Sequence, residues 1–272
     1  MDYEPIKLKI AVLYDGGGLA RKGLEDAGHE CVGVELNPVK HKMSKYVGSG
    51  NSILANVLEL DDSFYHQFDA VWSSPPCQSY SDQKVDDKIG EFGNPECLPH
   101  SMTLAEKYPH LKAVWVENVF SDFFIPHATR YNAAQFLSVP TQRRRRLIGG
   151  SYRKPKTLRP FKYDYVEFRR IAPPACLASE IGHGGLSKNI SDERRKFTRW
   201  YLQYKKRRPT INDMAIAQGF IIPDEWSRFD DRQISQAIGN GVPVYMSRAF
   251  GEAYSKPETI KQSNFFELVD AV

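Results

Sequence analysis

Short apolar runs alternate with amphipathic stretches over residues 1–120 of the chain. Four of the runs have the length of a buried strand: KIAVLY (9–14), ECVGVEL (30–36), FDAVWSS (68–74) and KAVWVENV (112–119). Residues 19–27 and 37–46 have helical patterns, and SILANVLEL (52–60) is a weaker segment. Strands that alternate with helices predict a doubly wound, Rossmann-like α/β sheet, whose ligands bind outside the carboxyl ends of the strands.

This regular pattern is interrupted between residues 151 and 208. That segment contains prolines at 155, 160, 173 and 174 and the glycine-rich stretch IGHGGLSK, which predict an irregular inserted module. After it, INDMAIAQGF (211–220) predicts a short helix that ends at Gly219. Residues 233–254 carry a longer helical pattern that GNGVP interrupts.

A chain of 272 residues can hold one large α/β domain with a small appended module. With 41% hydrophobic and 26% charged residues, the composition is ordinary for a soluble globular protein, and no apolar run approaches the roughly 20 residues of a membrane helix. The sequence MDYEPIKLKI lacks the pattern of a secretory signal, so we expect a cytoplasmic protein without a membrane partner. The cysteines show no CxxC pair, so the sequence predicts neither a metal site nor a disulfide framework; they are Cys31, Cys77, Cys97 and Cys176.

The formal net charge of +4 hides a strong asymmetry along the chain. Residues 151–208 contain 16 Lys and Arg against 5 Asp and Glu, a balance of +11. The run 143–146 raises this balance to +15 and leaves −11 for the rest of the chain. A basic module joined to an acidic body favours a polyanion such as nucleic acid as the partner, over a solvated lysine-rich surface.

The glycines 16–18 separate the first predicted strand from the first predicted helix. Such a turn lets the backbone approach a cofactor, and the helix start favours a negative group. Glu35 ends the second strand about 20 residues later, at the spacing where a carboxylate meets a ribose hydroxyl. The pair predicts a nucleoside-bearing cofactor, although a tight turn and a surface carboxylate would give the same pattern.

Reactive side chains follow two other predicted strands. Pro75 and Pro76 cannot continue a strand ladder, so the chain must turn at Cys77, where an accessible thiol suits a nucleophile. Glu117 and Asn118 end the strand KAVWVENV. We expect Cys77 and Glu117 to converge, with Glu117 either a proton donor in an apolar setting or a polar residue where a strand meets water.

Four consecutive arginines, 143–146, precede LIGG and lie beside a strand-like stretch rather than in a tail. Arginine is the preferred donor for carboxylates, phosphates and base edges. Alternate residues of an extended strand point to the same side, so Arg144 and Arg146 are expected to share a face. A solvated charge run is the other interpretation.

Taken together, these segments resemble, in order, the motifs of the DNA cytosine-5 methyltransferase family. The segments are LYDGGGLARKGLEDAG (13–28, cofactor motif), FDAVWSSPPCQSYS (68–81, catalytic motif), ENV (117–119), NAAQFLSVPTQRRRRL (132–147, arginine motif), RPTINDMAIAQGF (208–220) and AIGNGVPVYMSRAF (237–250). Residues 151–207 match no motif, and there the family has its variable target-recognition region. The basic segment coincides with this region, which supports the resemblance independently.

The resemblance implies a Rossmann-like, S-adenosylmethionine-dependent methyltransferase fold with a small, irregular and basic target-recognition module. It implies a catalytic and cofactor-binding domain over 1–150, a target-recognition domain over 151–232, and a segment over 233–272 that returns to the first domain. The partner would be double-stranded DNA and the protein a monomer. The implied catalytic residues are Cys77, Glu117, Arg144 and Arg146. The implied cofactor-binding residues are Tyr14, Asp15, Gly16, Gly18, Glu35, Leu36, Asn56, Pro76, Asn240 and Val242.

In the mechanism that the resemblance implies, the Cys77 thiolate adds at C6 of a cytosine that has been flipped out of the duplex. Glu117 would hold the N3 and amino edge, and Arg146, with Arg144 in support, would bind the base carbonyl or brace Glu117. A base that the sequence does not identify then removes the C5 proton, so that Cys77 can leave.

Three features depart from the family pattern. Asp15 replaces the usual Cys or Ala before the first glycine, Leu19 replaces a glycine, and Asn56 stands where the third strand would usually supply an acid near the adenine.

The arginine motif also departs from the pattern, because its extra residues allow two registers. Anchoring on residue 142 selects Arg144 and Arg146 and leaves residue 147 to begin the next strand, whereas anchoring on residue 140 selects the arginines at 143 and 145. We prefer the first register.

Other functions fit parts of the pattern. An amino-methyltransferase needs an aromatic residue after the proline pair, where this chain has Cys77. An RNA cytosine methyltransferase fits the main motifs equally well, and a catalytically silent homologue would not need the cysteine, Glu117 and the arginines. A nicotinamide dehydrogenase leaves the segment 75–78 unexplained. The target sequence stays open, as does the role in restriction, viral self-protection or regulation, but the short module favours a short target or low selectivity.

Overall fold

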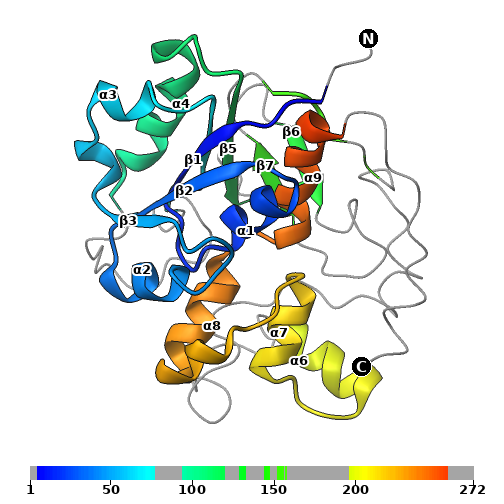
Figure 1. Cartoon of the computed structure of the whole chain (residues 1–272). Helices are drawn as coiled ribbons and strands as arrows, with labels where there is room; N and C mark the ends of the chain where they lie inside the picture. Colours follow the sequence, from blue (N-terminus) through cyan, green and yellow to red (C-terminus); the bar gives the residue numbers. More distant parts are fainter. Residues whose placement is uncertain are drawn as a thin grey trace.

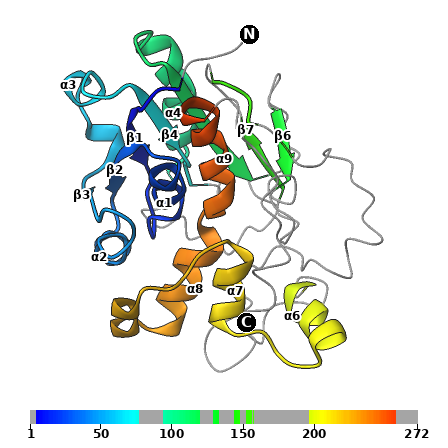
Figure 2. The same ribbon diagram turned by 45° about the vertical axis from the view of Figure 1, so that its right-hand side comes forward.

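The computed structural model describes residues 5–76, 94–119, 129–132, 144–147, 152–155, 157 and 196–256 (Figure 1). These residues form a mixed sheet with helices packed on it and a group of helices at one end of the molecule (Figures 1 and 2). Among them, no helix combines the length and the apolar character that crossing a membrane requires.

Five parallel strands form the body of the sheet in the order β3-β2-β1-β4-β5. Their bounds are β1 Lys9–Leu13, β2 Glu30–Glu35, β3 Ser52–Leu54, β4 Ala70–Ser73 and β5 Ala113–Val119. The strand order reverses between β1 and β4. At such a switch point the connections leave toward opposite faces, and a crevice forms at the carboxyl ends of the strands.

Two further strands extend the sheet beyond β5. The strand β7 (Arg144–Leu147) pairs antiparallel with β5, and β6 (Thr129–Asn132) pairs antiparallel with β7. Register places Arg146 opposite Asn118, and Leu147 opposite Glu117. Three of the four arginines, 144–146, therefore lie in the strand next to the Glu117 strand; residue 143 lies outside the described residues. The expectation that Leu147 begins a strand is wrong, because it is the last residue of β7.

Each face of the sheet has its own apolar core, since alternate residues of a strand point to opposite faces. On one face, Ile10 and Val12 pack with α1 (Leu19–Asp26) and α9 (Val244–Ser255), which lie side by side (Figures 1 and 2). On the other face, Ala11 and Leu13 pack with residues of helices that follow β3 and β4. Those helices are η1 Val57–Glu59, α3 Asp62–Tyr65 and α4 Cys97–Lys107.

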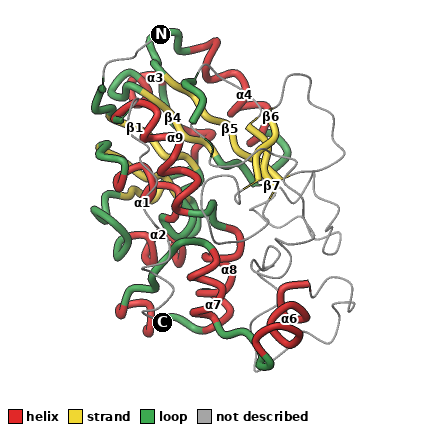
Figure 3. Tube along the Cα trace, turned by 90° about the vertical axis from the view of Figure 1, so that its right-hand side faces the viewer, coloured by secondary structure: helices red, strands yellow, loops and turns green. Residues whose placement is uncertain are grey.

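A third apolar cluster joins the first half of the chain to the helices of the second half. Figure 3 shows the course of these helices. Trp226 is fully buried at its centre, and its indole Nε1 donates to the Met43 carbonyl oxygen at 3.0 Å. Besides α1 and α9, the helices that contribute are α2 Pro38–Ser44, α6 Lys196–Trp200, η4 Tyr201–Lys205, α7 Ile211–Ala217, η5 Asp224–Arg228 and α8 Asp231–Asn240. Through this cluster, the second half of the chain packs against α2, next to the glycine turn.

The four apolar runs and the helical patterns of the sequence correspond to β1, β2, β4, β5, α1, α2, α7, α8 and α9. The structure adds α3, α4 and β6, which the sequence pattern did not predict. The prediction of an irregular module is wrong for 196–205, where α6 runs into a π-helical turn, η4. The rest of that module lies almost entirely outside the described residues.

Candidate cofactor and active site

The glycine turn at the carboxyl end of β1 is built on left-handed backbone. Tyr14 (φ 59°), Gly16 (φ 58°) and Gly18 (φ 87°) all have positive φ, which is unusual for a tyrosine. Gly18 is the residue before α1, and a Cβ atom there would lie 3.0 Å from Arg21 Nη2 and 3.1 Å from Val47 Cβ. Backbone conformation and space therefore both require glycine at 18.

Glu35 at the end of β2 is bonded directly to this turn. Its Oε2 accepts the Gly16 N–H at 2.7 Å, and its Oε1 accepts the Asn37 N–H at 2.7 Å. Asn37 in turn caps α2, since its side chain accepts from the backbone N–H groups of residues 39 and 40. A carboxylate has about four acceptor positions, so each Glu35 oxygen can still accept a hydroxyl hydrogen bond.

Apolar side chains stay exposed beside Glu35. Leu36 is 43% exposed and Leu54, the last residue of β3, is 52% exposed. The Asn56 side chain forms hydrogen bonds within its own segment. Its Oδ1 accepts from Leu58 N at 3.1 Å, and its Nδ2 donates to Glu59 Oε1 at 2.8 Å. The Asn56 side chain thus caps η1, while Leu36 and Leu54 provide an apolar surface at the ends of two parallel strands.

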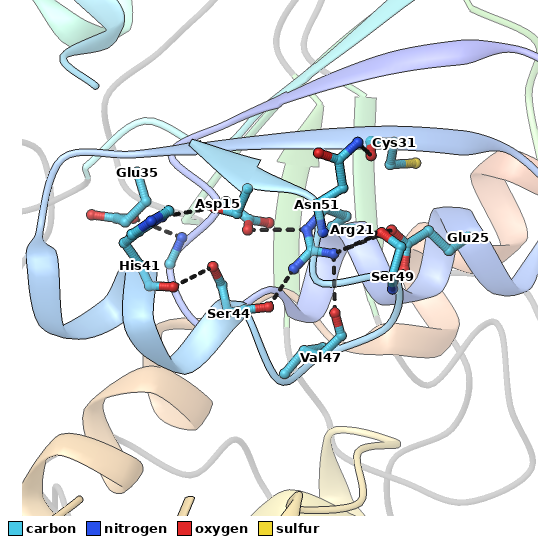
Figure 4. Close-up of polar contacts among 12 residues, drawn as sticks. Asp15, Arg21, Glu25, Cys31, Glu35, His41, Ser44, Val47, Ser49 and Asn51 are labelled. Carbon is cyan, nitrogen blue, oxygen red and sulfur yellow. Dashed lines mark hydrogen bonds and ion pairs between the residues drawn. The ribbon is translucent and has the colours of Figure 1, made fainter. Parts of the chain in front are cut away.

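Asp15 is buried, and its side chain points toward Arg21 (Figure 4). Its Oδ2 is 3.1 Å from Nε of the buried Arg21, and burial raises the Asp15 pKa to about 6 although the Arg21 charge opposes this shift. Asp15 Oδ1 has no hydrogen-bond partner among the described residues. Asp15, which departs from the family pattern, therefore has a buried charged partner, Arg21.

The residues that lead into the proline–cysteine turn lie against the end of β5. Asn118 Nδ2 donates to the Pro75 carbonyl oxygen at 3.3 Å, and both residues are buried. Glu117, the neighbour of Asn118, is only 5% exposed. This contact brings the segment 74–76 to the Glu117 end of β5. The convergence of Cys77 itself with Glu117 stays a prediction.

Several predicted catalytic groups lie where the structure does not describe them. Cys77 lies outside the described residues, one position after Pro76. For Arg144 and Arg146 only the backbone, in β7, is described. Their catalytic roles stay predictions.

The carboxyl-terminal motif packs against the start of α1. A side chain at Gly241 would begin 2.8 Å from Leu19 Cδ2, which places the motif beside the glycine turn. Asn240 is exposed at the end of α8, whereas Val242 is buried in the core with α9. Segments about 220 residues apart in sequence thus meet at the turn.

Sequence reasoning missed two residues of this region, Arg21 and Asn118 as a hydrogen-bond donor. Arg21 occupies the buried side of α1 among Leu19, Ala20 and Leu24. A charged residue at an apolar position of an amphipathic helix is the signal that would have identified it. In the described part of the chain, no three His, Cys, Asp or Glu side chains gather as a metal site would need.

Comparison with solved structures finds the same fold in methyltransferases. A methyltransferase of Entamoeba histolytica, EhMeth, is 14% identical, with a TM-score of 0.61 over 94% of this chain and 100% of that one. The Dnmt2 methyltransferase of S. pombe is 15% identical (TM-score 0.58, 92% and 99% covered). A protein from an E. coli prophage, described as a DNA modification methyltransferase, is 16% identical (TM-score 0.59, 93% and 100% covered).

No protein-family model and no curated protein matches the sequence. At these low identities the structural likeness establishes the fold. The chain has the Rossmann-like methyltransferase fold that its motifs predicted.

Proposed function

We propose that the protein is an S-adenosylmethionine-dependent methyltransferase that methylates C5 of cytosine in double-stranded DNA. The observation that carries this proposal is the bond from Asn118 to the Pro75 carbonyl, beside the buried Glu117. It supports an approach to Cys77 at the strand end where Glu117 lies, at the same carboxyl edge of the sheet as the glycine turn, which follows β1 on the other side of the switch point.

The turn and its surroundings fit S-adenosylmethionine. Glu35 has acceptor capacity for the two ribose hydroxyls, and the exposed Leu36 offers an apolar surface for the adenine ring. The left-handed turn at Gly16 and Gly18 lets the backbone come close to the ligand. When bound, the cofactor supplies an electrophilic methyl group on a sulfonium.

Residues of the chain would supply the electrons that make the cytosine ring nucleophilic at C5. The Cys77 thiolate forms a bond to C6 of the cytosine, and the C5–C6 π electrons make C5 nucleophilic. Glu117 binds the N3 and amino edge and stabilises the charge that develops there. C5 gains the methyl group, loses its proton to a base, and the returning electron pair breaks the C6–S bond and releases Cys77.

Double-stranded DNA is the proposed partner because basic side chains gather where the target-recognition region is expected. Residues 196–208 contain six Lys and Arg and no Asp or Glu. Lys205, the last residue of the π-helical turn, and Lys206, the residue after it, are both exposed. Arg207 differs, since it forms two hydrogen bonds to Asp213, at 2.6 and 2.7 Å, and helps to hold this segment on α7.

A cysteine substitution tests the catalytic part of this proposal. Cys77→Ser should abolish methyl transfer to DNA and leave S-adenosylmethionine binding intact, because a hydroxyl is a far weaker nucleophile than a thiolate. Cys31→Ser is the matched control, since Cys31 is buried at the opposite end of the sheet strands. Transfer of a labelled methyl group is measured on DNA and RNA in parallel, and calorimetry gives the cofactor affinity.

Mass spectrometry of the digested nucleosides identifies the methylated atom. We expect 5-methylcytosine from DNA. Substantial turnover by the Cys77 variant would contradict the mechanism, and a methylated amino group or activity on RNA alone would contradict the proposed substrate.

A further inference from the structure

The side chain of Arg21 is completely buried and is bonded to three separate parts of the chain (Figure 4). Within the glycine turn it donates through Nε to Asp15 Oδ2 at 3.1 Å. At the end of α2 it donates through Nη2 to the Ser44 carbonyl at 2.7 Å. In the connection between α2 and β3 it donates through Nη1 to the Val47 carbonyl at 3.0 Å.

Two further contacts complete the surroundings of the guanidinium. Nη1 also donates to Glu25 Oε1 at 3.2 Å and to Ser49 Oγ at 3.4 Å. Taking a guanidinium out of water is costly unless charge and hydrogen bonds compensate, and here every nitrogen has an acceptor. A buried arrangement of this kind has one geometry, so it fixes the relative positions of the segments that it joins.

Those segments are the ones that form the proposed cofactor site. The Asp15 carboxylate lies against β2, since a Cβ atom at Gly33 would be 2.3 Å from Asp15 Oδ2. The next residue after Asp15, Gly16, donates to Glu35, and Glu35 accepts from the residue that caps α2. Since Arg21 binds both Asp15 and the far end of α2, the contacts close a ring around the turn.

We propose that Asp15 and Arg21 are a positioning pair, which holds the glycine turn and Glu35 at the spacing that S-adenosylmethionine requires. Both side chains of the pair are fully buried, so the pair acts through Gly16 and Glu35. This inference rests on the cofactor part of the proposed function. It does not depend on the base that is methylated or on Cys77.

The pair also gives cofactor binding a dependence on pH. The charged groups around Asp15 are Arg21 and Glu25 on α1 and Glu35 on β2. Burial raises the Asp15 pKa to about 6, so the carboxylate that pairs with Arg21 is lost as the pH falls through this value. Cofactor affinity should therefore decline in acid, and Asp15→Asn should remove this decline.

Three variants separate positioning from stability. Arg21→Met should raise both Kd and KM for S-adenosylmethionine about tenfold, with kcat changed less than about twofold, because the loss is in ground-state binding. Asp15→Asn tests the other partner. Asp15→Ala combined with Arg21→Met removes both buried charges, so it should regain stability and yet retain the raised Kd. Lys112→Met is the control, since Lys112 forms a half-exposed ion pair with Asp69 at the opposite end of the strands.

Calorimetry measures the Kd at pH values from about 5 to about 8. Steady-state kinetics and the melting temperature are measured over the same pH range. A double variant with both wild-type stability and wild-type cofactor affinity would overturn the inference, because the pair would then be only structural. A wild-type protein that does not bind S-adenosylmethionine would instead contradict the proposed function. The two failures are thus distinguishable.

Discussion

At the scale of single residues, Glu35 connects the fold to the proposed chemistry. Its two oxygens accept the N–H groups of Gly16 and Asn37, both at 2.7 Å, so the carboxylate that is proposed to bind the ribose also shapes the turn. Hydrogen bonds to a charged acceptor are stronger than neutral ones. Much of the binding free energy for a ribose should therefore depend on the Glu35 charge.

Glu35→Gln should weaken S-adenosylmethionine binding about tenfold to a hundredfold, since hydrogen bonds to charged groups contribute about 1.5–3 kcal/mol. Calorimetry measures the Kd. Asp61→Asn is the control, because Asp61 is an exposed carboxylate that caps α3. An unchanged Kd for the Glu35 variant would contradict the assignment of the ribose site.

The sequence predicted Glu35, Gly16 and Gly18 because a strand, a glycine turn and a second strand end form a local pattern. Arg21 was not predicted, because its partners at Ser44 and Val47 lie 23 and 26 residues away and are backbone carbonyls, which every residue has. The bond from Asn118 to Pro75 spans 43 residues and depends on β4 and β5 being neighbours. Contacts of this kind follow from topology, which a linear pattern does not contain.

At the scale of elements, the sheet and α9 meet at a buried histidine. His29 Nδ1 accepts the Leu8 N–H at 3.1 Å, and its Nε2 is 2.9 Å from the Gly251 carbonyl oxygen, to which it donates. One imidazole thus joins the start of β1, the start of β2 and α9. Burial lowers the His29 pKa, and this arrangement requires the neutral ring.

The free energy of unfolding should therefore fall as the pH drops from about 7 to about 5. The folded-state pKa of His29 lies below its unfolded value, so the unfolded chain binds the extra proton and the stabilisation is present only at higher pH. The raised Asp15 pKa changes the free energy of unfolding with pH in the opposite direction. The contribution of His29 is therefore isolated by comparing variants with the wild type. Denaturant unfolding of His29→Gln should show a flatter pH dependence than wild type, and exposed His66→Gln should not.

Element prediction succeeded where a buried run was long enough to be recognised. β1, β4 and β5 are buried on both faces and read as continuous apolar runs. β6 has the sequence TRYN, without a periodic signal, and α4 contains a proline and mixed polarity in CLPHSMTLAEK. The helix at 196–200 was not predicted, because basic residues surround its few apolar residues in the sequence. In the fold, Phe197 and Trp200 pack with residues of α2 and α7.

At the scale of the whole molecule, the charge distribution separates a basic segment from an acidic body. The segment 196–208 lies among the helices at one end of the molecule (Figure 2). Binding of such a surface to DNA releases counterions, so the observed affinity falls with salt in proportion to the number of phosphates that are neutralised. The two exposed lysines at the end of η4, Lys205 and Lys206, are proposed to be part of this contact.

Replacing Lys205 and Lys206 by alanine should reduce the slope of log K against log salt by about 0.9 for each phosphate contact that is lost. Fluorescence anisotropy with duplex DNA at several salt concentrations gives the slope. Lys107→Ala with Lys112→Ala is the control, since these lysines pair with Asp62 and Asp69 on the sheet domain. A slope that both pairs of substitutions change equally would count against the basic segment as the docking face.

Covalent attack of Cys77 on C6 is tested most directly by trapping the protein on DNA that contains 5-fluorocytosine. Fluorine at C5 cannot leave as a proton does, so elimination stops after methyl transfer and the C6–S bond persists. Random-sequence duplex is used because the target is unknown, and the adduct is mapped by mass spectrometry after protease digestion. We expect one stable adduct at Cys77 that forms only with S-adenosylmethionine. An adduct at another residue, or none from a protein that makes 5-methylcytosine in ordinary DNA, would contradict the mechanism.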